Sequence, residues 1–285
     1  MMTNVYIGID FGGTKIAGGV VKDGKIIKRH QVPTRANEGK AIVLSQLREV
    51  ISVLSKGSKI KGIGIGVPGL FKGTKILLLP NVQALNGVDV KKALRLTVPV
   101  VLENDARCFA LAEANFGAAR GKKNVLGVIL GTGVGGGVVI EGRAYRGANE
   151  SAGEIGHMIH EISLNKFSPL DKHGDWESLL SGPSMIRRNI ERGGKEDHPA
   201  TIWNAESEEA KATKEEWLRH VTIFFASLQY AFDPEAIVVG GGLSNIDFYP
   251  EVNKRLKDYG ARSIVKKGKL QVDAAILGSV VALNS

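Results

Sequence analysis

Apolar residues in the first third of the chain change their spacing, and the changes separate strands from helices. Residues 7–21, IGIDFGGTKIAGGVV, consist of two apolar runs around a glycine-rich turn, which predicts two strands joined as a hairpin. The turn KDGK at 22–25 and the segment after it predict a third strand. Apolar positions at helical spacing predict a helix over 38–55, whereas KGIGIGVPG at 61–69 predicts a buried strand that ends in a Pro-Gly turn.

A further strand and helix follow, and then the opening pattern returns. PVVLEND at 99–105 predicts a strand that runs directly into a helix at 106–117. Residues 125–147, VLGVILGTGVGGGVVIEGRAYRG, repeat the plan of strand, Gly-Thr turn, Gly-Gly-Val-Val strand, charged turn and strand. The offset is a constant 118 residues, with Gly136 matching Gly18. Matching turns at one offset predict an internal duplication, and therefore two similar lobes that each present a Gly-Thr hairpin.

The remainder of the chain is predicted to be mainly helical. Helical periodicity covers 176–191 and 215–232, and the second segment leads into a strand and three glycines at 234–245. Residues 272–283, VDAAILGSVVAL, predict a closing helix. No low-complexity linker interrupts these elements, so an α/β architecture with ordered crossings between the lobes is expected.

Composition narrows the class of protein. The chain has 285 residues, 43% hydrophobic and 24% charged, as in an ordinary globular protein with ample core. The formal charge of +9 is spread along the chain without a zinc finger, an aromatic-basic stretch or an N-terminal helix-turn-helix, so no nucleic-acid partner is expected. The start lacks a signal-peptide pattern, no apolar run is long enough for a membrane span, and Cys108 is a single cysteine. We therefore expect a cytoplasmic protein with no membrane partner.

The first glycine turn contains residues suited to phosphate and to a metal ion. Gly12 and Gly13 expose backbone amides and admit a bulky group. Thr14 and Lys15 add a hydroxyl and a positive charge, which suit phosphate. Asp10 ends the first strand with a carboxylate, which suits a metal ion held through oxygen.

The second glycine turn, GTGVGG at 131–136, matches the dinucleotide pattern G-x-G-x-x-G only in its letters. A dinucleotide-binding turn leads from a strand into a helix, and here the glycines lead into another strand. Neither turn is a Walker A loop, which requires G-x-x-x-x-G-K-[ST] before a helix. Two Gly-Thr turns between strands suit two hairpins that hold a phosphate chain from opposite lobes.

Asp105 is a candidate for acid–base chemistry. It ends an apolar strand after Glu103 and Asn104, at a sheet edge of the kind where α/β proteins bind ligands. The same position suits an ordinary N-cap of the following helix. Taken alone, the residues leave both interpretations open.

A series of short motifs then identifies a resemblance to a known family. DFGGTK, GVPG, ENDA, GTGVGGG, GEIGH, WE and IVVGGG occur in the order and rough spacing of the ROK family of repressors, open reading frames and kinases, over almost the whole chain. The resemblance implies a two-lobed actin-like ATPase (ribonuclease H-like) fold, with duplicated mixed sheets and ATP in the cleft between the lobes. We expect a small N-terminal lobe at 1–106, completed by the C-terminal helix at about 272–285, and a large lobe at 107–271.

The resemblance also implies a role for each motif. Asp105 becomes the general base that takes a proton from a sugar hydroxyl, and Asp10 holds Mg²⁺. The implied sugar-binding residues are Gly66, Val67, Pro68, Gly69, Asn81, Asn104, Glu154, His157 and Glu177. The implied ATP-binding residues are Gly12, Gly13, Thr14, Lys15, Gly131, Thr132, Gly133, Gly240, Gly241 and Gly242.

One departure from the family pattern concerns zinc. Many members have a zinc loop after the histidine, C-x-C-G-x-x-G-C-x-E, whereas this chain has no cysteine there and Asp175 stands at the last cysteine's position. We therefore expect no structural zinc. The alternative that the residues leave open is a site that His157, His160, His173 and Asp175 could make without thiolates. The orientation of His157 is expected to come from packing or hydrogen bonds, and residues 159–175 are expected to be mobile in the empty protein.

The residues after Asp105 raise two smaller questions. Arg107 stands where relatives usually have a small polar or apolar residue, and either a contact with phosphate or sugar or an outward orientation would account for it. Cys108 is expected to be a small core residue.

These observations predict an ATP-dependent hexose kinase of the glucokinase type, which phosphorylates the 6-hydroxyl and closes around its sugar to exclude water. An N-acetylmannosamine or N-acetylglucosamine kinase would use the same residues. A sugar-sensing repressor would need a DNA-binding domain before the first strand, and a chaperone-like ATPase would not need the predicted sugar-binding residues. The implied partners are the hexose, ATP and a second copy of the chain in a homodimer.

Overall fold

Two five-stranded β-sheets in the chain share one strand order. The computed structural model describes residues 5–160 and 174–284. The first sheet has the order β3-β2-β1-β4-β7 and the second the order β10-β9-β8-β11-β12. The first sheet consists of β1 (Val5–Phe11), β2 (Lys15–Lys22), β3 (Lys25–Pro33), β4 (Ile60–Val67) and β7 (Val100–Asn104). The second consists of β8 (Val125–Leu130), β9 (Val134–Ile140), β10 (Arg143–Ala144), β11 (Ala236–Gly240) and β12 (Ile264–Lys267).

Strand directions and turns confirm the predicted duplication. In each sheet the first three strands pair antiparallel and the last two add in parallel. The second turn of each hairpin places two residues at positive φ, Asp23 (50°) and Gly24 (72°) in the first sheet, and Glu141 (50°) and Gly142 (78°) in the second. This is the geometry of the tight hairpin turn whose twist matches that of the strands.

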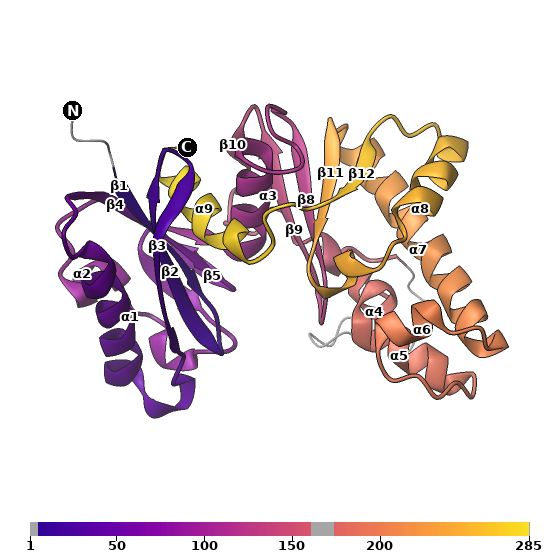
Figure 1. The fold of residues 1–285 in the computed structure, drawn as a ribbon, viewed down its shortest axis with the longest axis horizontal. Helices are drawn as coiled ribbons and strands as arrows, with labels where there is room; N and C mark the ends of the chain where they lie inside the picture. Colours follow the sequence, from indigo (N-terminus) through magenta and orange to yellow (C-terminus); the bar gives the residue numbers. More distant parts are fainter. Residues whose placement is uncertain (1–4, 161–173, 285) are drawn as a thin grey trace.

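Two helices lie between the sheets (Figure 1). Helix α3 (Asp105–Asn115) packs on β8 and β9, α9 (Ala274–Val281) packs on β1 and β4, and the two helices pack on each other. Their approach is close because glycines face them: a Cβ on Gly64 would lie 1.9 Å from the Ser279 carbonyl oxygen, and one on Gly278 would lie 1.8 Å from that of Cys108. Cys108 is fully buried there, as predicted.

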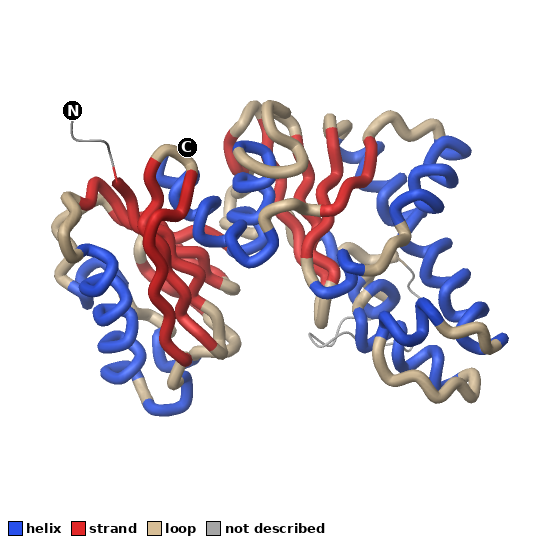
Figure 2. The backbone as a smooth tube through the Cα atoms, in the orientation of Figure 1, coloured by secondary structure: helices blue, strands red, loops and turns tan. Residues whose placement is uncertain are grey.

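The remaining helices cover the outer faces of the sheets (Figure 2). Helix α1 (Lys40–Ser55) packs on β2 and β3 and meets the short α2 (Val90–Leu94). The larger helical layer consists of α4 (Glu177–Leu180), α5 (Gly182–Glu191), α6 (Pro199–Asn204), α7 (Glu208–Phe232) and α8 (Tyr249–Leu256). Helix α7 lies at the centre of the hydrophobic core between this layer and the second sheet, where Phe224 and Phe225 are fully buried with residues of β8 and β11.

The prediction of one helix over 176–191 is wrong. The chain leaves helical geometry at Ser181 (φ −67°, ψ 156°), so that α4 and α5 are separate. Pro183 explains the break, because it has no N–H to donate to the carbonyl of Leu179 and its ring would clash with the preceding turn. The new helix begins with Gly182, whose N–H donates to the Gly131 carbonyl at 2.8 Å. The break therefore joins the helical layer to the second Gly-Thr turn.

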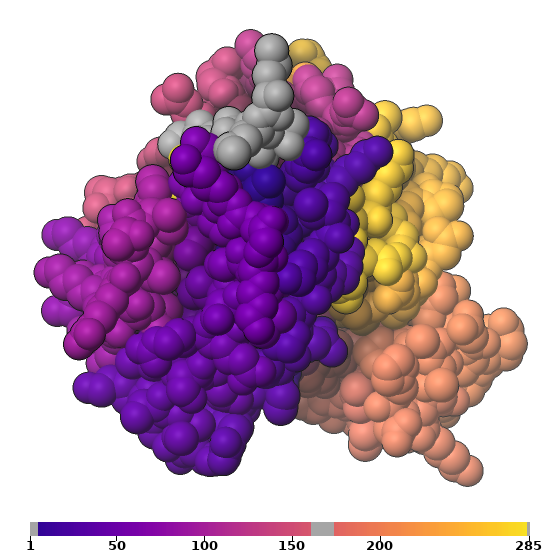
Figure 3. Space-filling view, turned by 60° about the vertical axis from the view of Figure 1, so that its left-hand side comes forward, coloured from indigo at the N-terminus to yellow at the C-terminus, as the bar shows by residue number. Residues whose placement is uncertain are grey.

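The C-terminal residues return to the N-terminal part of the molecule. In Figure 3 they form the yellow surface beside the indigo N-terminal residues. Because α9 packs on β1 and β4, the geometry is compatible with a small lobe completed by the C-terminal helix, and the residue limits of the two lobes stay a prediction. A hairpin of β5 (Leu70–Lys72) and β6 (Lys75–Leu78) extends from the small lobe. Across the described ranges, no helix has the length and apolarity that crossing a bilayer requires.

Candidate active site

Asp105 stands where β7 ends and α3 begins. The principal cap of that helix is Asn104, whose Oδ1 accepts hydrogen bonds from the amides of Ala106 (3.0 Å) and Arg107 (3.2 Å). Asp105 is the first helical residue, and its Oδ1 accepts a second bond from Ala106 at 2.9 Å. Since Asn104 already satisfies the first free amides, Asp105 is not needed as a cap, and its carboxylate lies at the edge of two cavities.

The carboxyl of Asp105 holds its proton more tightly than an ordinary aspartate does. Burial, together with the negative charges of Asp10 and Glu154, raises the pKa of Asp105 to about 6, against the opposing effect of the hydrogen bond from Ala106. A general base works best when its pKa is near the operating pH. Asp105 is therefore suited to accept a proton from a hydroxyl near neutral pH.

Two cavities meet at Asp105. One, of about 560 Å³, lies toward the small lobe and the loop that contains Glu154. The other, of about 420 Å³, lies toward Asp10 and the glycines after β11. A group that passes from one cavity to the other would pass this carboxylate.

The 560 Å³ cavity has one polar and one apolar side. The sequence prediction placed Pro68, Gly69, Asn104, Glu154 and His157 at one site, and the structure brings all five to this cavity together with Asp105. Sequence reasoning missed the other side chains that line it. Its polar side also includes Ser151, and its apolar side is completed by Leu70, Leu78 and Pro80.

Other predicted sugar-binding residues lie outside the lining of this cavity. Gly66 and Val67 are buried in β4. Asn81 lies against the first glycine turn, where a Cβ on Gly13 would be 2.7 Å from the Asn81 Cβ. The carboxylate of Glu177 accepts a hydrogen bond from the Val134 amide at 2.9 Å, so it supports the second glycine turn.

His157 is oriented by Asp175. The Nδ1 of His157 lies 3.2 Å from Oδ2 of Asp175, which is fully buried, and the other carboxylate oxygen of Asp175 accepts the Ser178 amide at 2.9 Å. With Asp175 on Nδ1, the Nε2 of His157 is the ring nitrogen available to the cavity. His173 and most of the segment expected to be mobile, residues 161–173, lie outside the described residues.

The first glycine turn is held in shape by backbone bonds. The Gly12 amide donates to the Lys15 carbonyl at 3.0 Å, and the Thr34 hydroxyl donates to the Gly12 carbonyl at 2.7 Å. Thr14 and Lys15 are exposed at its tip. In the second turn the Gly131 amide donates to the Gly133 carbonyl at 2.9 Å. The two turns are thus similar preformed loops on the two sheets.

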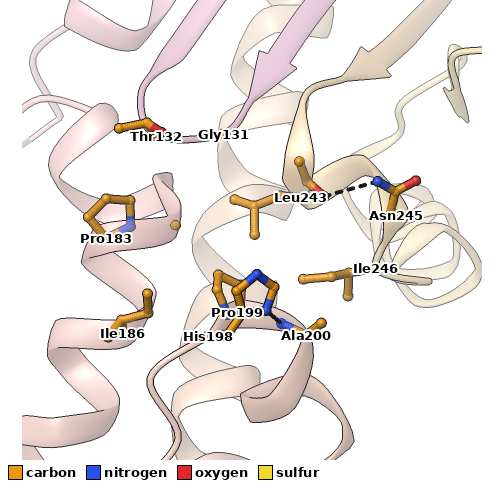
Figure 4. Close-up of a pocket in the computed structure, with 12 residues that line it drawn as sticks. Gly131, Thr132, Pro183, Ile186, His198, Pro199, Ala200, Leu243, Asn245 and Ile246 are labelled. Atoms are coloured by element: carbon orange, nitrogen blue, oxygen red, sulfur yellow. Dashed lines mark hydrogen bonds between the residues drawn. The ribbon is translucent and has the colours of Figure 1, made fainter. Parts of the chain in front are cut away.

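A third cavity, of about 570 Å³, lies beyond the second turn (Figure 4). Gly131 and Thr132 form one end, and Gly242 and Asn245 line both this cavity and the 420 Å³ cavity. Its walls are largely apolar and were not predicted from the sequence. They are formed by Pro183, Ile186, His198, Pro199, Leu243 and Ile246.

The glycines after β11 make the close approach at this junction possible. Gly241 has φ +82°, and a Cβ there would lie 2.3 Å from the Leu130 carbonyl oxygen. A Cβ on Gly240 would lie 2.7 Å from the ring of Phe109. Both positions therefore require glycine, and the chain can turn from β11 directly into the cavity wall.

Asp10 has the surroundings that the predicted Mg²⁺ site requires. It lies in β1 and lines the 420 Å³ cavity with Asp105, and burial raises its pKa, partly offset by the positive charge of Lys15. Mg²⁺ commonly takes one or two carboxylates and fills its other positions with water and substrate phosphates, so this donor set fits the ion. Within residues 5–160 and 174–284, no group of three or more His, Cys, Asp or Glu side chains is placed to hold a metal by itself.

Duplicated mixed sheets, a pair of Gly-Thr turns and a carboxylate between two cavities define the class as a phosphotransferase of the actin-like ATPase fold. The sequence model of the ROK family matches residues 6–284, and the chain belongs to this family. It is 35% identical to an N-acetyl-D-glucosamine kinase of Vibrio parahaemolyticus over 273 residues, which cover 90% of each chain.

Solved structures agree with this assignment. A ROK hexokinase from Thermus thermophilus superposes with a TM-score of 0.88 at 31% identity, covering 98% of this chain and 97% of that one. A ROK glucokinase from Streptomyces griseus, solved with glucose and AMPPNP, superposes with a TM-score of 0.75 at 27% identity, covering 97% and 98%. The protein is an ATP-dependent sugar kinase.

Proposed function

We propose that this kinase phosphorylates the 6-hydroxyl of an N-acetylhexosamine, with N-acetyl-D-glucosamine as its first acceptor. The observation that supports this choice is the two-sided 560 Å³ cavity. Asn104, Glu154 and His157 offer hydrogen-bonding groups for ring hydroxyls, and Leu70 and Leu78 offer an apolar surface for the acetamido methyl group. The relatives named N-acetyl-D-glucosamine kinase, 32–35% identical, favour the same acceptor.

A plain hexose is the second candidate, as the sequence first predicted. The similarity to the Thermus thermophilus hexokinase at 31% identity supports it. The proposed hydroxyl-binding residues are the same for both acceptors. The difference between the acceptors is therefore their contact with the apolar side of the cavity. An acetamido group would bury its methyl there, whereas the 2-hydroxyl of a hexose would gain little from it.

In the proposed reaction, the residues of the cavities and of the two glycine turns take part as follows. The sugar lies in the 560 Å³ cavity with its 6-hydroxyl toward Asp105. Asp105 accepts the hydroxyl proton as the oxygen bonds to the γ-phosphorus, while the bond from that phosphorus to the β,γ-bridging oxygen breaks and ADP leaves. The amides of the two glycine turns, around Gly12 and Gly131, hold the phosphates from opposite sides. Mg²⁺ at Asp10, largely through water, would supply charge neutralisation. The adenine ring lies in the 570 Å³ cavity between the apolar walls.

The reaction is tested by sugar-dependent ADP release across a panel of acceptors. We expect turnover with N-acetyl-D-glucosamine to exceed turnover with N-acetylmannosamine, glucose and mannose in kcat/KM. A 6-deoxy analogue should bind without turnover, which checks the position of transfer. Higher kcat/KM for glucose would favour the second candidate, and no sugar-dependent ADP release with any acceptor would disprove the function.

Substitution of two neighbouring leucines on β6 tests which of the two acceptors the cavity favours. Leu77 and Leu78 are similarly exposed, at 49% and 45%, but only Leu78 lines the cavity. We expect Leu78→Ser to lower kcat/KM for N-acetyl-D-glucosamine about five- to twenty-fold relative to glucose, since one apolar contact is worth about 1–3 kcal/mol. Leu77→Ser is the matched control and should leave the ratio unchanged.

The homodimer and the cytoplasmic location stay part of the proposal. Sedimentation of the purified protein tests whether it is a homodimer.

A further inference from the structure

Arg107 is a buried charged residue to which the proposed reaction assigns no role. It lies on α3, two residues after Asp105, and is only 2% exposed. Its Nε donates to Oε1 of Glu103 at 2.6 Å, and Glu103 is fully buried. Neither orientation that the sequence left open is observed, because the side chain does not point outward and lines none of the three cavities. A buried ion pair is weak evidence for stability, so its other contacts must show what it does.

The guanidinium also holds the loop that leads to Glu154. Its Nη1 donates to the backbone carbonyls of Glu150 at 3.0 Å and Ala152 at 3.4 Å. The residue between them, Ser151, lines the sugar cavity, and so does Glu154 just beyond. Glu150 has φ +60°, a conformation that a residue with a side chain keeps only where its surroundings enforce it.

Glu103 extends the same network to both ends of the loop. Its Oε1 also accepts the Asn104 amide at 2.8 Å, next to Asp105. Its Oε2 accepts a hydrogen bond from Nε of Arg146 at 2.9 Å and forms an ion pair with Nη2 of the same residue at 2.8 Å. Arg146 lies at the start of the loop that follows β10, and its carbonyl accepts the Ala152 amide at 3.1 Å. The loop is therefore fixed to the end of β7 at two points.

A third contact reaches the opposite wall of the cavity. The Cζ of Arg107 lies 5.7 Å from the centre of the Phe71 ring, within the range of a cation–π interaction. Phe71 is buried in β5 beside Leu70, which lines the apolar side of the sugar cavity. One side chain thus touches the catalytic helix, the polar wall and the support of the apolar wall.

We propose that Arg107 is a positioning residue for the sugar: it keeps the loop at 145–153 and the β5–β6 hairpin in register with Asp105. The inference rests on the proposed sugar site. Loss of the guanidinium fork should let Glu154 and the apolar wall shift relative to Asp105, and a shift of about 1 Å can cost a factor of 10². We therefore expect the sugar KM to rise about ten- to hundred-fold while the ATP KM stays within about three-fold, because Arg107 contacts neither glycine turn.

The test compares three Arg107 variants with Glu103→Gln alone and with one control. Arg107→Lys keeps the charge but cannot bond Glu103 and both carbonyls together, so it should show an intermediate sugar KM. Arg107→Met leaves Glu103 short of a partner and is liable to fold poorly. The double variant Glu103→Gln with Arg107→Met removes both charges and should recover stability without restoring the two loop bonds. It is compared with Glu103→Gln alone, because that substitution by itself weakens the ion pair between Glu103 and Arg146. Arg255→Met is the control, since Arg255 on α8 bonds Glu215 and Glu251 away from the three cavities.

The kinetic outcome distinguishes positioning from mere stability. A folded double variant whose sugar KM is raised above that of Glu103→Gln, with an unchanged ATP KM, supports the proposal. A double variant with the same KM values as Glu103→Gln for both substrates would show that Arg107 matters only as the partner of Glu103, and would overturn it. An equal rise in both KM values would overturn it as well. Arg255→Met should change neither.

Amide hydrogen exchange adds a readout that needs no sugar. In the double variant the amides of 145–153, including that of Ala152, should exchange about ten-fold faster or more than in Glu103→Gln, while those of α7 stay at the wild-type rate. Unchanged exchange in this loop would disprove the positioning role even if the kinase reaction is as proposed. A wild-type protein without sugar-dependent ADP release would disprove the function instead, and the exchange result would still decide whether Arg107 holds the loop.

Discussion

At the scale of single residues, the groups around each buried carboxylate determine what that carboxylate can do. Burial, together with the negative charges of Asp10 and Glu154, raises the pKa of Asp105 to about 6, which suits its proposed role as a base. Asp175, by contrast, is bonded to His157 and to the Ser178 amide. Carboxylates in the same region therefore have distinct tasks, because their partners differ.

Replacement of Asp105 by asparagine tests the base directly. Asp105→Asn keeps the shape of the side chain but cannot accept a proton, so we expect kcat to fall by about 10²–10⁴ with the sugar KM little changed. Steady-state ADP release measures both. Asp89→Asn is a matched control, because Asp89 caps α2 with its carboxylate and lies in none of the cavities. Near-wild-type turnover of Asp105→Asn would show that another group takes the proton.

His157 provides the second test at this scale. Since Asp175 already orients its Nδ1 at 3.2 Å, no metal is needed to fix the ring. We expect purified protein to contain no stoichiometric zinc by elemental analysis, and activity to survive a chelator once Mg²⁺ is restored. One tightly bound zinc per chain, with activity lost on its removal, would contradict this prediction.

At the scale of elements, the proposed reaction makes the two Gly-Thr turns the parts whose backbone approaches the phosphates. Gly131 has room for a Cβ within the fold, since the nearest atom would be the Gly242 nitrogen at 3.7 Å. We expect Gly131→Val to raise the ATP KM about ten-fold or more, with the sugar KM and the melting temperature close to wild type, because the branched side chain occupies the phosphate side. Gly62→Ala in β4 is the control for a buried glycine away from the turns.

The strands and hairpins were predictable because they depend on patterns among residues that are close in the sequence. Hairpins follow from apolar runs and Gly-containing turns. The duplication follows from the equal spacing of the Gly-Thr turns and of the strands after them, in which Gly18 matches Gly136. The residues of the candidate site that lie on motifs were predictable for the same reason. The break at Ser181 was missed because it depends on one proline in a strongly periodic segment.

The rest of the site depends on contacts between distant segments. Leu70 and Leu78 of the β5–β6 hairpin line the 560 Å³ cavity together with Asn104 from the end of β7 and Ser151 from the loop at 145–153. Arg107 meets carbonyls that are 43 and 45 positions away, and nothing in its neighbouring residues indicates that it turns inward. Local periodicity has no information about such pairs, so a structure is needed to find them.

At the scale of the whole molecule, the two sheets are joined through α3 and α9. The 560 and 420 Å³ cavities meet at Asp105, and the 570 Å³ cavity shares Gly242 and Asn245 with the 420 Å³ cavity. Closure around a sugar would bring the two Gly-Thr turns toward the same phosphates, so both copies of the duplicated hairpin would take part in binding ATP.

The stability of the folded protein depends on the larger helical layer as well. There α7 carries His220, whose ring centre lies 6.1 Å from that of His160, and whose Nδ1 is 3.4 Å from Nη1 of Arg188.

His220 makes the folded protein sensitive to acid. Burial, with the positive charge of Arg188 and despite the negative charge of Glu216, lowers its pKa from 6.5 to about 4. The unfolded chain therefore binds a proton between pH 6.5 and 4 that the folded chain does not bind, so the stabilisation is fully present above pH 6.5 and is lost as pH falls toward 4. We expect the urea midpoint to fall across this window, and to fall less steeply in His220→Gln, which cannot take up the proton. Parallel pH profiles for the two proteins would show that His220 does not contribute to this loss.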